Sequence, residues 1–243
     1  NIIFILSKSL FLRSICPMKE APLFIHIQGI PEYIVYTWVI MGILFATAFA
    51  ASRGIKPLPA GIQNFFEMVV DGIMKFMEDI IGHHSRQYLP LIGMLAFFIL
   101  ISNLMGLVPG FMSPTSNINT TAACAIIVFF ATHYYGVKAH GISYIKHFFG
   151  PIRSLPAIPL MLLMLILELI GHFARVLSLS LRLFGNIFGE DLILLILVFL
   201  VPILMPLPIM FIAIFTSVVQ TFVFVLLTMI YIKLATEEAE EGH

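Results

Sequence analysis

The fold class of this chain is decided by one long apolar stretch, residues 157–205: AIPLMLLMLILELIGHFARVLSLSLRLFGNIFGEDLILLILVFLVPILM. A continuous helix of this length would measure roughly 73 Å at ~1.5 Å per residue, over twice the ~30 Å hydrocarbon core of a bilayer. We therefore expect the stretch to lie strongly tilted, to bend, or to fold back as a hairpin. Its ionisable side chains are Glu168, His172, Arg175, Arg182, Glu190 and Asp191.

The composition places the chain in lipid. Of its 243 residues, 60% are hydrophobic and only 11% are charged, whereas a soluble domain carries about 25% charged residues. The formal net charge is zero, which gives no reason to expect nucleic-acid binding. The two cysteines, Cys16 and Cys124, have no metal-ligand or redox spacing. We expect no metal and no cofactor.

Four further segments are long enough and regular enough to form helices of this membrane domain. Apolar spans are expected near residues 33–51, 89–108, 118–137 and 209–235. Residues 60–82 instead draw one polar stripe down a helix, made of Asn64, Glu67, Asp71, Lys75 and Glu78. This spacing predicts an amphipathic helix at the membrane surface or against a partner. The expected fold is an all-α integral membrane protein with about five crossings and one surface helix.

The remaining segments set the boundaries and the orientation. Residues 33–236 are expected to form a single membrane domain, followed by an acidic tail at 237–243. Residues 1–32 form an N-terminal segment to which we assign no function, although residues 1–17 loosely resemble a signal peptide. The connectors 53–86 and 138–153 carry the basic residues, so the positive-inside rule places them in the cytoplasm, with the N-terminus outside and the C-terminus inside.

Four ionisable residues of the long stretch share one face of a helix. Glu168, His172, Arg175 and Arg182 fall within about 80° of one another at 100° per residue. A charged group at the bilayer centre costs about 2.5–3.5 kcal/mol on insertion scales, so such a stripe favours an ion path over scattered surface charge. The alternative is a structural network in which Glu168 and Arg175 neutralise each other through His172.

Arg182 differs from the other three because no acidic residue lies within one helical turn of it. Its counter-charge must come from elsewhere in the chain or from another subunit. Arginine stays protonated at physiological pH, so it cannot relay a proton by releasing one. It can hold a neighbouring carboxylate ionised and can block a continuous proton wire.

The residues around Arg182 carry a family resemblance. The run SLSLRLFGN at 178–186 resembles the signature of the F-type ATP synthase subunit a family. NLMGLVP at 103–109 and PTSNINTT at 114–121 are similar to two further motifs of that family, and Gln220, eleven residues before Tyr231, matches its last helix. The resemblance covers roughly residues 60–236.

The resemblance implies a mechanism and a set of partners. In this family, two long, steeply inclined helices contact a rotating ring of c subunits, each bearing one carboxylate. Protons reach that carboxylate through one aqueous half-channel and leave through another on the opposite side of the membrane. The expected partners are the c ring, b-type peripheral stalk subunits and membrane lipid, in the inner membrane of a bacterium. The chain itself is expected to be non-catalytic, and it contains nothing similar to a phosphate-binding loop.

The resemblance also implies roles for single residues. Arg182 matches the essential arginine between the half-channels, and Gln220 matches its partner on the last helix. Glu168 matches the acidic position of the cytoplasmic half-channel, with Arg175 where the family has a basic group. Asp191 matches the acidic position of the outer half-channel. The full set of candidate proton-path residues is Arg182, Gln220, Glu168, Asn186, Asp191, Glu190, Arg175, His172 and Asn103.

Two positions depart from the family pattern. Ala213 stands where some relatives carry His or Glu, and Gly106 stands where some carry Asp. The outer path must therefore depend on other polar residues, for which the candidates are Asp191, Glu190, Asn103, Asn117 and, as a further candidate, His133.

Several simpler interpretations stay open. Gln220 could be a helix–helix hydrogen bond in lipid, and Asn103 could serve packing as well as a channel. His133, His140 and His147 recur every seven residues, as haem ligands could, but Gly136 and Gly141 should break that helix. A self-contained channel or secondary transporter is the main alternative function, and a cytochrome-like electron carrier is a third class.

Overall fold

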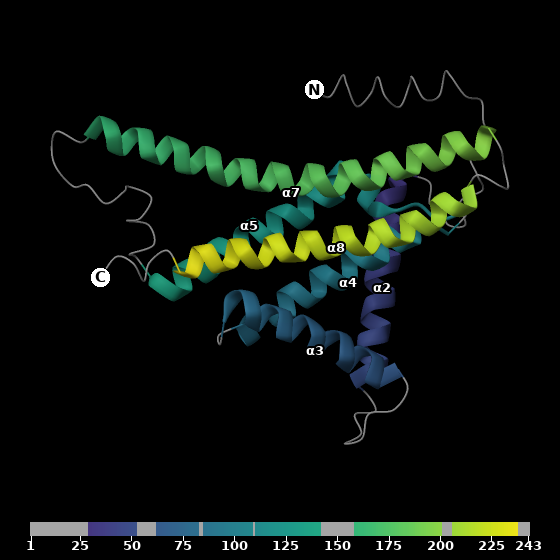
Figure 1. Ribbon diagram of the computed structural model, residues 1–243, viewed down its shortest axis with the longest axis horizontal. Helices are drawn as coiled ribbons and strands as arrows, with labels where there is room; N and C mark the ends of the chain where they lie inside the picture. Colours follow the sequence, from purple (N-terminus) through teal and green to yellow (C-terminus); the bar gives the residue numbers. More distant parts are fainter. Residues whose placement is uncertain are drawn as a thin grey trace.

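The computed structural model describes residues 29–52, 62–82, 85–108, 110–141, 158–200 and 206–237. Within these ranges the chain is helical and has no strand (Figure 1). The α-helices are α2 (Glu32–Ser52), α3 (Ile62–Ile81), α4 (Leu89–Met105), α5 (Ile118–His140), α7 (Ile158–Leu200) and α8 (Pro206–Glu237). Two short 3₁₀ turns join them, η1 (Ser85–Tyr88) and η2 (Pro114–Ser116). The predictions for residues 1–17, for residues 53–61 and 142–153 of the basic connectors and for residues 238–243 of the acidic tail fall outside the described residues.

Four of the described helices are long and apolar enough to cross a bilayer. They cover Glu32–Phe49, Ser85–Met105, Ile118–Ala139 and Leu207–Thr236. Together with the all-helical architecture, they confirm an all-α membrane protein. The fifth expected crossing, α7, is not among the four, so its passage through the membrane stays a prediction.

The long stretch that decided the fold class forms one continuous helix. α7 has 43 residues and is therefore about 65 Å long at 1.5 Å per residue. Of the three possibilities for this stretch, a hairpin is excluded over residues 158–200. α7 and α8 lie side by side and run in opposite directions along the longest axis of the molecule, while α2 lies across them (Figure 1). A helix this long can fit a bilayer only if it is strongly inclined.

Three helix ends differ from the sequence prediction. α5 continues through Gly136 to His140, so the predicted break at Gly136 is wrong; one glycine inside a helix costs only about 1 kcal/mol. The helix stops instead at Gly141, whose φ of +56° favours glycine. α8 begins at Pro206, three residues before the predicted start at 209, because proline is tolerated in the first turn of a helix. α4 ends at Met105, three residues before the predicted end at 108.

Two apolar clusters hold the helices together. The first joins α4, α5, α7 and α8 around Ile99, Val128, Leu183 and Phe224, all at most 2% exposed. This cluster fixes α7 against its neighbours and so positions the ionisable stripe.

The second cluster fixes α3 to the rest of the chain. Met77 of α3 is fully buried with Tyr88, Ile92 and Met229. The predicted polar stripe of α3 faces outward, with Asn64, Glu67, Asp71, Lys75 and Glu78 all exposed. The apolar face of this amphipathic helix therefore packs on α4, α8 and η1 of its own chain.

Candidate functional site

The ionisable stripe of α7 lies along the edge of the face that packs against the other helices. His172 is buried, Glu168 and Arg175 are half-buried, and Arg182 is exposed. This order of burial follows from helical geometry, because His172 lies about 40° to one side of Glu168 around the helix axis and Arg182 lies about 40° to the other side. The packed face, with Leu183, is on the His172 side. The stripe therefore divides into two parts. Glu168, His172 and Arg175 form what we call the inner cluster, and Arg182 faces outward.

Arg182 has no counter-ion among the residues that the structure describes. The Glu168 carboxylate lies 3.5 Å from His172 Nδ1, about three turns away from Arg182. The guanidinium lies on the surface of the isolated chain, so the described residues leave its charge uncompensated.

Asn186, one turn after Arg182, connects α7 to α8. Its Nδ2 donates a hydrogen bond of 2.5 Å to Oε1 of Gln220. Gln220 was expected to be the partner of the arginine, but the structure pairs it with Asn186. Gln220 is buried, and its Nε2 has no hydrogen-bond partner among the described residues. Ser217, one turn earlier on α8, is also fully buried with an unpartnered hydroxyl, and the sequence analysis missed it.

A second set of polar residues surrounds Asp191 and Glu190. The Asp191 carboxyl lies near the Ser116 hydroxyl in η2. Glu190 is half-buried, and its Oε2 has no hydrogen-bond partner in the described part of the chain. η2 thus brings a polar loop against the C-terminal half of α7.

Behind η2, hydroxyl groups connect the loop to α4. Ser113 Oγ donates to the Ser102 carbonyl oxygen at 2.9 Å and lies 2.7 Å from Thr115 Oγ1. Thr115 Oγ1 donates to Asn103 Oδ1 at 2.7 Å, while Asn103 Nδ2 has no partner in the described residues. We call Ser102, Asn103, Ser113 and Thr115 the loop cluster. The sequence analysis named only Asn103 as a candidate, although the uncharged loop with its hydroxyl groups was a visible signal.

Asn117, a candidate for the outer path, has a local structural role. Its side chain accepts a hydrogen bond of 3.0 Å from the Asn119 amide and caps the N-terminus of α5.

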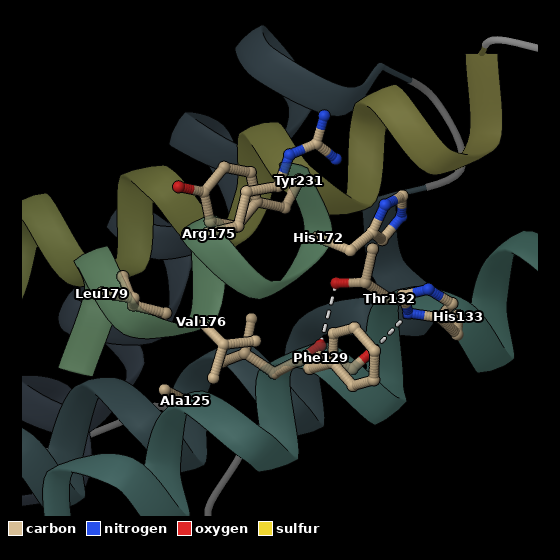
Figure 2. Close-up of a pocket in the computed structure, with 10 residues that line it drawn as sticks. Ala125, Phe129, Thr132, His133, His172, Arg175, Val176, Leu179 and Tyr231 are labelled. Carbon is tan, nitrogen blue, oxygen red and sulfur yellow. Dashed lines mark hydrogen bonds between the residues drawn. The ribbon is translucent and has the colours of Figure 1, made fainter. Parts of the chain in front are cut away.

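The inner cluster lies where α5, α7 and α8 meet (Figure 2). The His133 and His172 ring centroids are 4.8 Å apart, and the Arg175 guanidinium lies 5.6 Å from the centre of the Tyr231 ring. His172 Nδ1 is 3.5 Å from Glu168 Oε1. Arg175 therefore stacks on an aromatic ring, and Glu168 pairs with His172, rather than the two forming a direct ion pair.

His133 does not lie with the outer candidates. α5 and α7 are antiparallel neighbours, because Thr121 contacts Ser180 while His133 contacts His172. His133 is thus placed beside the first half of α7, about 28 Å along the helix from Asp191. The structure therefore places His133 beside His172 rather than beside Asp191 and Glu190.

The described residues leave the haem alternative untested. Among the described residues, no three His, Cys, Asp or Glu side chains form a group that could hold a metal ion. The His140 side chain and His147 fall outside the described part of the chain, so the heptad of histidines is not tested.

Comparison with known proteins adds to this geometry. Residues 34–233 match the family model of the ATP synthase A chain. The chain belongs to the ATP synthase subunit a family. It is 49% identical over 234 residues to an ATP synthase subunit a of Geotalea uraniireducens, covering 96% of this chain and 98% of the relative. It is 52% identical over 208 residues to ATP synthase subunit a 1 of Pelobacter propionicus, covering 86% and 89%.

Family membership confirms the resemblance seen in the sequence. The chain is a proton-translocating membrane subunit of the Fo sector of an ATP synthase, and it works with partner subunits of that complex. A subunit a of Trichlorobacter lovleyi is a third relative, 52% identical over 206 residues, with 85% of this chain and 87% of the relative covered. A bacterial membrane fits these bacterial relatives.

Proposed function

We propose that this chain is the non-catalytic stator subunit that leads protons to and from a carboxylate on a rotating c ring. Two half-channels serve the two sides of a bacterial inner membrane, and Arg182 separates them. ATP is formed elsewhere in the complex, and b-type stalk subunits hold this chain in place. The orientation follows the positive-inside rule, with the C-terminus in the cytoplasm.

The observation that carries the proposal is the isolated charge of Arg182. The side chain is exposed on α7 and has no counter-ion among the described residues. An arginine cannot discharge itself at physiological pH, and an uncompensated charge in hydrocarbon is costly. A carboxylate supplied by a neighbouring subunit removes that cost, and the arginine in turn keeps this carboxylate ionised until it moves away.

The outer half-channel is supported by buried polar atoms that lack protein partners. Such atoms occur on Ser102, Asn103, Glu190, Ser217 and Gln220. Buried polar groups in native proteins are almost always hydrogen-bonded, and those without protein partners are bound to water. These atoms come from α4, α7 and α8, so the proposal assigns a hydrated path from Asp191 and Glu190 towards the Asn186–Gln220 pair.

The cytoplasmic half-channel is assigned to the other end of the stripe. Glu168 is half-buried and sits beside His172 and Arg175, seven or more residues before Arg182. On a continuous α7 the arginine then lies between the two polar clusters, where its fixed charge separates two water-filled paths.

The central test is Arg182→Ala in the complete ATP synthase, assayed in inverted membrane vesicles. ATP-driven proton pumping should fall to background, because the ring carboxylate is no longer held ionised, while the complex still assembles with its ring of c subunits. Ser178→Ala, an exposed change one turn earlier, is the matched control and should pump normally.

Two outcomes would contradict the proposal. Normal pumping by the Arg182→Ala complex would remove the separating role of the arginine. Proton conduction by the purified chain alone in liposomes, without a c ring, would favour a self-contained channel.

A further inference from the structure

A small cavity lies between α5, α7 and α8 at the inner cluster (Figure 2). Its volume of about 20 Å³ is enough for about one water molecule. The two imidazole rings lie next to each other on one side of it, and Ala125 and Leu179 close the opposite end (Figure 2). The lining includes side chains that can hydrogen-bond a water, namely Thr132, His133, His172, Arg175 and Tyr231.

The two histidines are held in the same way by different helices. His133 Nδ1 lies 2.8 Å from the Phe129 carbonyl oxygen, and His172 Nδ1 lies 2.8 Å from the Glu168 carbonyl oxygen. A neutral imidazole in this position donates its Nδ1 proton to the carbonyl, because a carbonyl oxygen only accepts. In both rings Nε2 is then the nitrogen that can take up a proton.

The titratable groups around the two histidines come from all three helices that line the cavity. α7 contributes Glu168 and Arg175, α8 contributes the phenol of Tyr231, and α5 contributes His133 itself. Arg175 sits over the Tyr231 ring at 5.6 Å, so it brings a fixed positive charge to the cavity.

We propose that His133 and His172, with one water molecule in the cavity beside them, form a proton relay on the Glu168 side of the path. This inference rests on the proposed function and names two of the residues that carry the proton there. A proton bound at Nε2 of His172 makes the ring an imidazolium. The Nδ1 proton then leaves towards Glu168 Oε1, 3.5 Å away. Only N–H and O–H bonds form or break, and the pair carries one proton at a time.

The test measures passive proton conductance of the Fo sector in vesicles after removal of the ATP-forming sector. His133→Ala and His172→Ala should each reduce the conductance by roughly a hundredfold, within the range of positioned acid–base groups. Ile126→Ala, a change on the same helix as His133 at a side chain that is 45% exposed and carries no titratable group, is the matched control and should conduct close to the wild-type rate.

Two further measurements separate a relay from a packing role. Added imidazole should restore conductance in the alanine variants, whereas pyrazole, a ring of the same size and far weaker basicity, should not. His133→Gln and His172→Gln keep a donor near the carbonyl but cannot bind and release a proton, so they should lose conductance as well. The quantity of assembled complex is measured for every variant. Where an alanine variant does not assemble, the conductance of the matching glutamine variant tests the relay instead.

The outcomes distinguish this inference from the function on which it rests. Wild-type conductance in both glutamine variants, or equal rescue by imidazole and pyrazole, overturns the relay. If the wild-type Fo sector itself shows no ring-dependent conductance, the proposed function fails instead.

Discussion

Gly106 offers a sharp test of how closely η2 packs against the end of α4. A Cβ added at Gly106 would lie 2.7 Å from the Ser113 Cβ and 3.4 Å from the Ser113 amide nitrogen. Gly106 has a φ of −64°, which any residue can adopt, so only the lack of space excludes a side chain. Any larger side chain would meet the same contact.

We predict that Gly106→Ala destabilises the chain by about 1–3 kcal/mol, the usual cost of overpacking. The clash forces Ser113 away from α4, and the loss of its hydrogen bond to the Ser102 carbonyl at 2.9 Å accounts for about 0.5–1.5 kcal/mol of this cost. Ser113→Gly removes the clashing atom. Gly106→Ala should therefore cost far less when it is made in a Ser113→Gly background.

The buried thiol of Cys124 provides the assay. Cys124 is a free cysteine, 4% exposed, in the apolar cluster of α4, α5, α7 and α8. In a Cys16→Ser background, a fluorescent maleimide labels it only when the structure opens. A destabilisation of 1–3 kcal/mol corresponds to labelling about 5- to 150-fold faster, read from the band of this chain on a gel. Labelling at the unaltered rate, or the same penalty with and without Ser113, would refute the reasoning.

Two further predictions concern α8. Phe224→Ala should destabilise the chain by about 3–5 kcal/mol, because removal of this fully buried ring leaves a cavity between four helices. The control is Phe215→Ala, which should change the stability little because this ring is 69% exposed. Equal labelling rates of the two variants in the thiol assay would contradict the prediction. Asn186→Leu and Gln220→Leu should each slow proton pumping. The double variant should pump at nearly the same rate as either single variant, because both single changes break the same hydrogen bond. Additive losses in the double variant would show that the pair does not act as a unit.

Helix periodicity was predictable wherever one face of a helix is apolar and the other polar. The stripe from Asn64 to Glu78 identified α3 and the face that stays exposed. Local rules were less reliable at helix ends. Gly136 does not break α5, and Pro206 begins α8, because packing and the tolerance of the first turn outweigh the intrinsic preference of one residue.

The site was predictable along each helix but not between helices. The positions on α7 gave the stripe, yet only the antiparallel packing of α5 and α7 puts His133 beside His172. The pairing of Asn186 with Gln220 and the burial of Ser217 depend equally on how α7 and α8 are aligned. Spacing within one segment carries no information on that alignment.

Because α7 is a single unbroken helix from Ile158 to Leu200, the number of residues between its two polar clusters is fixed by geometry. Inserting one residue between His172 and Glu190 would rotate everything beyond it by about 100° and move it by about 1.5 Å. Asp191 would then leave the face that meets η2. Inserting seven residues would nearly restore the rotation, to within about 20°, but would lengthen the helix by about 10 Å. This stretch can therefore exchange one residue for another far more readily than it can gain or lose one.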